Sequence, residues 1–123
     1  MVLLVDDDQD LRDSVADLLR QRGYTVATAE DGHAALAIIA GARVPCIVLL
    51  DLVMPGMDGW KFLAVVQADP TLSAIPIVIA SAHAATHAPA GTAGVLRKPF
   101  DFDELFTMVA RHCGPGGAPA AAC

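Results

Sequence analysis

Hydrophobic and polar positions divide this chain into two kinds of segment. Unbroken apolar runs predict strands at residues 2–5, 46–50 and 76–80, and two shorter or less regular runs predict further strands at residues 24–28 and 95–97. Apolar residues at helical spacing predict four helices between and after them, at residues 11–22, 32–41, 60–67 and 101–113. Continuous apolar strands that alternate with helices are typical of a parallel sheet covered on both faces. We therefore predict a doubly wound α/β fold.

Residues typical of helix ends indicate where the predicted helices begin and end, and the last of these helices marks the end of the domain. Gly23 follows the first helix as a C′ residue, and Asp31 is placed to cap the second. Asp101 and Glu104 have the spacing of a capping box at the start of the last helix. We predict one domain over residues 1–113, followed by a Gly/Pro/Ala tail at residues 114–123 that we expect to be disordered.

Composition excludes several classes of protein. Eight Lys and Arg against fourteen Asp and Glu give a net charge of −6, which disfavours direct binding to nucleic acid. No apolar run is long enough to span a bilayer, so we expect a cytoplasmic protein without membrane contact. Three cysteines without a CxxC pair disfavour a disulfide scaffold. We interpret Cys46 as a small core residue and expect Cys123 to be the most readily oxidised thiol.

Polar residues follow four of the predicted strands. Asp6 and Asp7 follow the first, Asp51 the third, Ser81 the fourth and Lys98 the fifth. Because the carboxyl ends of parallel strands share one edge, where ligands bind in open α/β sheets, we expect these side chains to converge. Three carboxylates repel one another unless a cation lies among them, and hard oxygen ligands suit Mg²⁺. With a lysine, a hydroxyl and a carboxylate able to form an aspartyl phosphate, this edge predicts a phosphoryl-transfer site.

These strand ends, the loop Met54-Pro55-Gly56-Met57-Asp58-Gly59 and the run Lys98-Pro99-Phe100 resemble the receiver domain of bacterial two-component response regulators. The resemblance covers about residues 2–113. It implies a flavodoxin-like, five-stranded parallel sheet of order 2-1-3-4-5 and a phosphorylation-dependent signalling switch. The donor would be a sensor histidine kinase or a histidine phosphotransfer protein, and the signal would pass to an unknown protein target. The chain would be no metabolic enzyme, since it would catalyse only its own phosphorylation and dephosphorylation.

The resemblance also implies roles for individual residues at the acidic edge. Asp51 would be the phosphoacceptor. Asp7, Asp51 and the backbone carbonyl of Val53 would bind Mg²⁺, and Asp6 would hold a metal-bound water. Asp8, by contrast, is interpreted as part of the first turn of a helix, where negative charge is favourable.

Further roles concern the switch and its timing. Ser81 and Lys98 would contact the phosphoryl group. Val95 stands where many members of the family carry an aromatic switch residue, so we expect that part of the switch to be absent or altered. Val53 and His83 flank the route of attacking water in the family, and we hypothesise that they tune dephosphorylation.

The segment at residues 83–94 departs from the family pattern. It is short, contains Pro89, Gly91 and Gly94, and lacks an apolar stripe. Because proline and glycine disfavour helix interiors, we expect the fourth helix of the family to be shortened or disordered here.

Two other functions stay open at this point. One is a Mg²⁺-dependent phosphatase with an aspartate nucleophile, since Asp6-Asp7-Asp8 also fits an Asp-x-Asp pattern. The other is a degenerate receiver that acts only as a protein-binding module. The phosphatase would depend on Asp6, whereas the switch would depend on Asp51.

Overall fold

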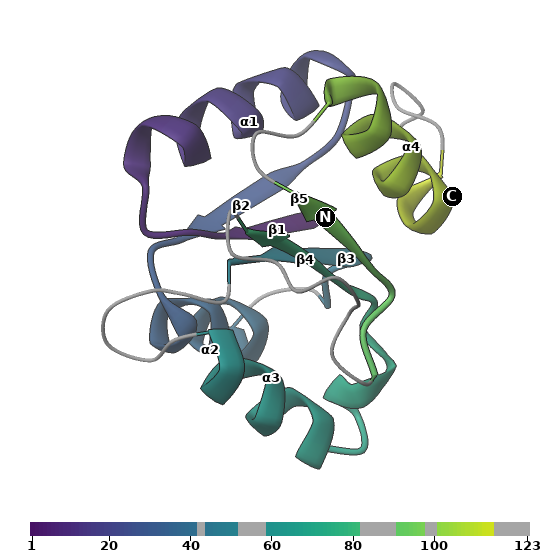
Figure 1. Ribbon diagram of the computed structural model, residues 1–123. Coiled ribbons are helices and arrows are strands. Elements are labelled where there is room, and N and C mark those ends of the chain that lie inside the picture. The colour runs from purple at the N-terminus through teal and green to yellow at the C-terminus, as the bar shows by residue number, and fades with distance from the viewer. Residues whose placement is uncertain (42–43, 52–58, 82–90, 98–100, 115–123) are drawn as a thin grey trace.

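The computed structural model describes the chain except for residues 42–43, 52–58, 82–90, 98–100 and 115–123, and describes only the backbone at Ser81 and Arg97. Five parallel strands form a sheet of order β2-β1-β3-β4-β5, which confirms the predicted fold (Figure 1). The order places β1 and β3 side by side in the interior of the sheet. The strands are β1 (Val2–Val5), β2 (Val26–Ala29), β3 (Ile47–Leu50), β4 (Ile77–Ser81) and β5 (Gly94–Arg97).

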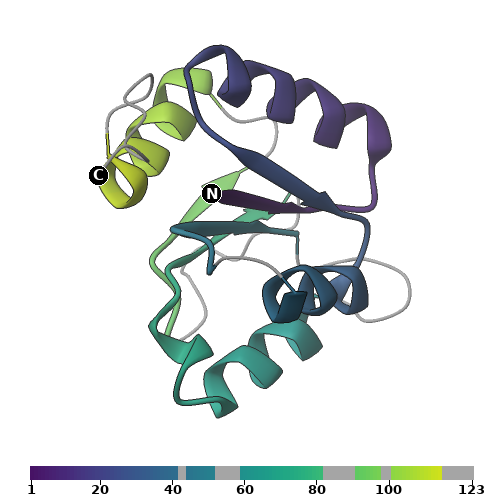
Figure 2. The ribbon, with the colours of Figure 1, turned by 180° about the vertical axis from the view of Figure 1, so that it is seen from behind.

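Helices cover both faces of this sheet. In the described residues they are α1 (Gln9–Gln21), α2 (Gly32–Gly41), α3 (Gly59–Ala68), α4 (Phe102–Cys113) and the short 3₁₀ helix η1 (Leu72–Ala74). Helices α1 and α4 lie on one face, and α2 and α3 lie on the other (Figures 1 and 2). None of the described helices is long and apolar enough to cross a membrane.

The predicted limits of the helices and strands lie within two residues of the observed ones. Residues 91–93, the described part of the unusual segment before β5, are not helical. The remainder of the expected shortened or disordered helix lies outside the described residues.

Alternating strand side chains build two separate cores. Leu3 of β1 belongs to the core beneath α2 and α3, together with Phe62. Its neighbour Leu4 belongs to the opposite core beneath α1 and α4, together with Leu105. All four residues of β1 and of β3 are buried, because both faces of the central strands are covered. This rigid centre fixes the positions of the residues that follow the two strands.

Local capping explains where the helices begin and end. Gly23 has φ 91°, the left-handed conformation that glycine adopts readily after a helix. Asp31 caps α2 by accepting a hydrogen bond from the N–H of Ala34 at 2.9 Å. Asp101 caps α4 but accepts from the N–H of Asp103 at 2.8 Å, one residue earlier than a capping box requires.

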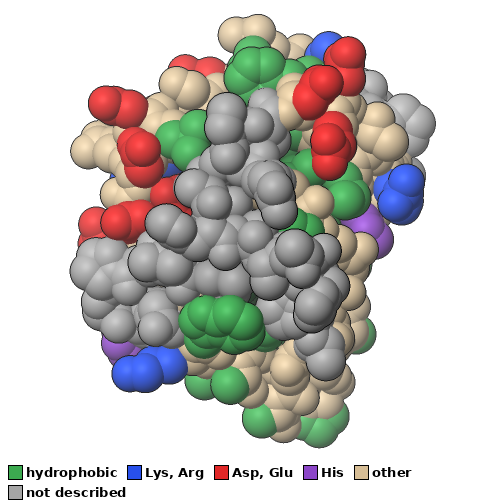
Figure 3. Space-filling model, in the orientation of Figure 1, with side chains coloured by type: hydrophobic (Ala, Val, Ile, Leu, Met, Phe, Trp, Pro, Cys, Tyr) green, Lys and Arg blue, Asp and Glu red, His purple; other side chains and the backbone are tan. Residues whose placement is uncertain are grey.

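Acidic side chains gather over α1 and α4, whereas apolar side chains gather over α3 (Figure 3).

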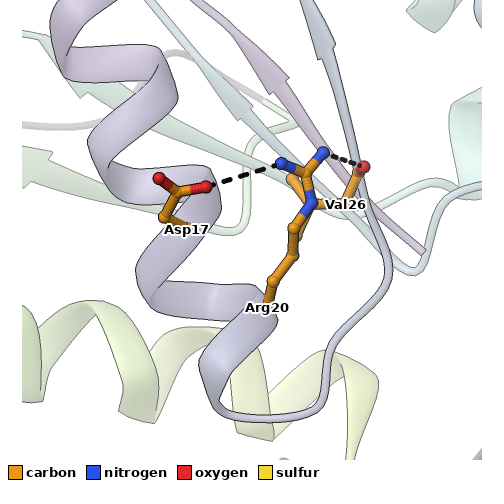
Figure 4. A network of polar contacts seen from close by, with 3 residues as sticks. All are labelled: Asp17, Arg20 and Val26. Atoms are coloured by element: carbon orange, nitrogen blue, oxygen red, sulfur yellow. Dashed lines mark hydrogen bonds and ion pairs between the residues drawn. The ribbon is translucent and has the colours of Figure 1, made fainter.

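On α1, Arg20 connects the helix to the sheet by donating a hydrogen bond from Nη2 to the carbonyl oxygen of Val26 at 3.0 Å (Figure 4). Its Nη1 atom also lies 3.8 Å from Oδ1 of Asp17. Because both side chains are exposed, this ion pair contributes little to stability, and the bond to the backbone is the more specific contact.

The cysteines differ from the prediction. A disulfide joins Cys46, just before β3, to Cys113, the last residue of α4, with Cα atoms 5.3 Å apart. Cys46 packs against the core beneath α1 and α4 and is partly buried, but its disulfide was not predicted from the sequence. The two residues are separated by 67 positions, so no local spacing signals the pair and only the fold brings them together. Cys123 lies outside the described residues.

Candidate functional site

Strand pairing brings two of the predicted acids to the same edge of the sheet. Val5 and Leu50, the last residues of β1 and β3, are partners in the parallel register. Asp6 and Asp51 follow them directly and are held by the backbone: the N–H of Asp51 donates to the carbonyl of Val5 at 2.9 Å. The two carboxylates therefore lie next to each other at the switch point of the doubly wound sheet.

Asp7 completes an acidic triad with these two residues. Carboxylate oxygens of Asp6, Asp7 and Asp51 all lie within 4.8 Å of one another. Asp6 and Asp51 are 8% and 7% exposed, whereas Asp7 is open to solvent. Oxygens around an octahedral Mg²⁺ at 2.0–2.1 Å lie about 2.9 Å apart when adjacent and about 4.2 Å apart when opposite. The triad therefore fits a magnesium ion after only small shifts of its side chains.

The neighbouring backbone orients the triad and separates Asp8 from it. Oδ1 of Asp6 accepts a hydrogen bond from the N–H of Asp8 at 2.9 Å. The carboxylate of Asp8 instead caps the start of α1 by accepting a hydrogen bond from the N–H of Leu11 at 3.1 Å. The interpretation of Asp8 as a helix-start residue is thus confirmed.

Arg12 supports the acidic triad, and it was not identified from the sequence. Its Nη1 atom donates to the carbonyl oxygen of Asp6 at 2.7 Å, and its side chain is only half exposed. This bond brings a permanent positive charge to the backbone that carries the triad. The sequence did contain a signal for this contact. A positive charge in the first turn of a helix interacts unfavourably with the helix dipole, so an arginine at this position indicates that its side chain has a specific hydrogen-bond acceptor.

Other predicted site residues are described in part or not at all. Ser81 ends β4 and pairs with Arg97, the last residue of β5, so the backbone places Ser81 at the carboxyl edge. The side chain of Ser81 is not described. Lys98, Val53 and His83 lie outside the described residues, and their roles stay predictions.

Val95, at the position expected to lack an aromatic switch, belongs to β5. It is partly buried and packs against the core beneath α2 and α3. The side chain therefore takes part in packing between the sheet and this helical layer.

Comparison with known proteins agrees with this geometry. The sequence model described as the response regulator receiver domain matches residues 2–110. The chain is 37% identical over 117 residues to the DNA-binding transcriptional regulator NtrC of Salmonella typhimurium. That match covers 90% of this chain and 24% of NtrC, so the chain spans about a quarter of that relative's length.

Solved structures show the same similarity. The chemotaxis protein CheY4 of Vibrio cholerae has a TM-score of 0.79 and 32% identity, covering 90% of this chain and 96% of CheY4. The response regulator TrrA of Thermotoga maritima, solved in complex with Mg²⁺-BeF, has a TM-score of 0.77 and 27% identity, covering 89% and 96%. With the sheet order, the acidic triad and the match over nearly the whole described chain, this protein belongs to the family of response regulator receiver domains.

Proposed function

We propose that this chain is a phosphorylation-dependent switch that accepts a phosphoryl group on Asp51 with Mg²⁺ bound beside it. Phosphorylation-dependent switching and Mg²⁺ binding are general to the receiver family. The observation that carries the proposal here is the triad, in which Asp6, Asp7 and Asp51 bring three carboxylates within 4.8 Å. Asp51 directly follows an interior strand and is buried, as suits a nucleophile in a fixed position. Asp6 shares these features, so the choice of Asp51 as the phosphoacceptor rests on the resemblance to the receiver family.

The metal site would be formed by Asp7, Asp51 and the carbonyl of Val53, with Asp6 holding a metal-bound water. When bound, Mg²⁺ neutralises charge on the carboxylates and on the incoming phosphoryl oxygens. Asp6, Asp7 and Asp51 carry a formal charge of −3, which Mg²⁺ and Lys98 would cancel. Without this compensation, a phosphoryl dianion would be repelled from the edge.

In the transfer, a carboxylate oxygen of Asp51 forms a bond to phosphorus while the bond from phosphorus to the imidazole nitrogen of the donor phosphohistidine breaks. The leaving imidazole takes up a proton. The modification replaces a charge of −1 with about −2. We propose that Ser81 and Lys98 contact the new phosphoryl oxygens and that Val53 and His83 tune the rate of hydrolysis.

Donor and output partners follow from the family role. Receiver domains interact with histidine kinases and with downstream effectors, so we propose a sensor kinase or a phosphotransfer protein as the donor and another protein as the target. We further propose that the chain catalyses only its own phosphorylation and dephosphorylation and is no metabolic enzyme. We also propose that the chain acts in the cytoplasm, the usual location of receiver domains, where reductants act on disulfides such as Cys46–Cys113.

Intact-mass measurement after incubation with Mg²⁺ and acetyl phosphate tests the proposal. The parent protein is expected to gain one phosphoryl group, and Asp51→Asn is expected to gain none. Asp8→Asn is the matched control, because Asp8 lies next to the triad yet caps α1, and it should still be phosphorylated.

Two outcomes of these experiments would contradict the proposal and support a different function. Turnover of phosphate esters that depends on Asp6 and survives Asp51→Asn would indicate a phosphatase. A protein that gains no phosphoryl group from acetyl phosphate or from a histidine kinase, with or without Mg²⁺, would indicate a pure binding module.

A further inference from the structure

The two helical layers expose different kinds of residue. All seven solvent-exposed residues of α1 are polar or charged. On α2, only one of four exposed residues is polar, and on α3 four of six are apolar. Trp60 and Val65 of α3 are 52% and 42% exposed, which is unusual for such large apolar side chains. A helix that is apolar on its outward side as well as its inward side is normally covered by another surface.

Four of the six exposed residues of α3 form one stripe, here called the α3 face, and Trp60 lies beside it: the stripe consists of Lys61, Ala64, Val65 and Ala68. They follow the i, i+3, i+4, i+7 spacing of one side of a helix. Two alanines in the stripe leave room for the backbone of another helix to approach closely. Figure 3 shows apolar side chains over this helix at the bottom of the view, away from the acidic side chains over α1 and α4.

We propose that the α3 face is the contact surface of a two-fold symmetric dimer of this chain, in which α3 packs antiparallel against α3 of a second copy. Val65 would lie at the symmetry axis. Lys61 and Asp69, the residue directly after α3, stand four residues before and after Val65, so an antiparallel pair places Lys61 opposite Asp69 of the partner subunit. Within its own chain, Oδ1 of Asp69 accepts from the N–H groups of Thr71 and Leu72. The α3 face together with Asp69 thus has opposite charges at its two ends and apolar residues between them.

Charge favours a second copy as the occupant of this face. The chain carries −6 overall, so two copies repel one another through most of their surface. Helices α2 and α3 together contain a single formal charge, that of Lys61, whereas α1 alone contains three aspartates and two arginines. An approach through α3 keeps the acidic residues of α1 and α4 on the far side of each sheet.

The area of the exposed surface of α2 and α3 determines how stable the proposed dimer can be. Two helices of ten residues, each about 15 Å long with axes about 10 Å apart, present about 300 Å² in projection. Stable interfaces bury about 800 Å² per partner. We therefore expect a weak, concentration-dependent dimer.

Sedimentation equilibrium tests this proposal, with Cys123→Ser as the background so that no disulfide between copies can form. Between about 5 µM and about 500 µM, the mass should rise from 12.7 kDa towards twice that value. Val65→Glu places two like charges at the axis and should weaken association at least about tenfold. Trp60 is the only tryptophan, so its emission should shift to shorter wavelength as the dimer forms.

Control variants test whether association uses the α3 face and the proposed antiparallel arrangement of the two helices. Phe102→Glu adds the same charge at another exposed apolar residue, 47% exposed on α4, and should leave association unchanged. Lys61→Glu should weaken the dimer, and adding Asp69→Lys to it should restore association. A mass that stays monomeric over the whole range, or equal weakening by Phe102→Glu and Val65→Glu, would overturn the proposal. Circular dichroism of each variant verifies that it is folded.

Discussion

Reduction of the Cys46–Cys113 disulfide should lower the free energy of unfolding substantially. The bond closes a loop across 67 positions of sequence. In the chain-entropy description, a cross-link over a loop of this length restricts the unfolded chain by about 4 kcal/mol at 25 °C. Since domains of this kind unfold with about 5–15 kcal/mol, the loss is a large share of total stability.

Urea unfolding of the Cys123→Ser variant, with and without reductant, measures this effect. The midpoint should fall on reduction, and the Cys113→Ser variant in the same background should unfold like the reduced protein in both conditions. The parent has three cysteines, and a thiol titration under denaturing, non-reducing conditions should find a single thiol, that of Cys123. Three reactive thiols, or identical midpoints with and without reductant, would refute the reasoning.

Three further predictions concern the acidic edge and the α4 side of the sheet. Mg²⁺ at a hundred times its dissociation constant should stabilise the parent by about 2.7 kcal/mol in thermal unfolding, and Asp7→Asn should abolish most of this gain because the triad loses a ligand. Arg12→Met should weaken Mg²⁺ binding measured by calorimetry, since Arg12 holds the backbone of Asp6, whereas Arg20→Met should not; equal affinities would contradict this role. Burial raises the pKa of Tyr24 above 10.0, although Arg22 lowers it in part. The stability from this neutral phenol is therefore complete below pH 10 and lost as the pH rises through the folded-state pKa. Absorbance titration of the only tyrosine should show ionisation at higher pH in the folded than in the urea-unfolded protein, and Tyr24→Phe should remove that part of the pH dependence.

The sheet and the acidic triad could be predicted because their signals are local. Each strand is a short apolar run, and Asp6, Asp7 and Asp51 stand directly after two of them. Once the strands are parallel, their carboxyl ends must share an edge, so the convergence follows from topology alone. A different local signal, the preference for negative charge at the start of a helix, assigned Asp8 to the first helix, where its carboxylate accepts a hydrogen bond from the N–H of Leu11.

The contacts that were missed depend on distances across the fold. Cys46 and Cys113 meet only because α4 ends beside the start of β3, and nothing in their sequence spacing indicates this. The contact of Arg12 was missed because helical periodicity does not tell how far a long side chain reaches back to the residue after a neighbouring strand. The limits of β2 were shifted for a related reason: Tyr24 continues the apolar run, but its hydroxyl donates to the carbonyl of Gly114 at 2.8 Å and the strand begins at Val26.

The position of Met1 has a practical consequence for attaching the protein to tags or surfaces. The carbonyl of Met1 accepts a hydrogen bond from the N–H of Cys46 at 2.8 Å, and its amino group lies 3.6 Å from the Sγ of Cys46. Because β1 is an interior strand, a fusion joined ahead of Met1 leaves from the middle of the sheet's amino edge. Such a fusion leaves the acidic edge accessible to a kinase while crowding the disulfide, so immobilisation through this end suits assays of phosphorylation better than assays of thiol chemistry.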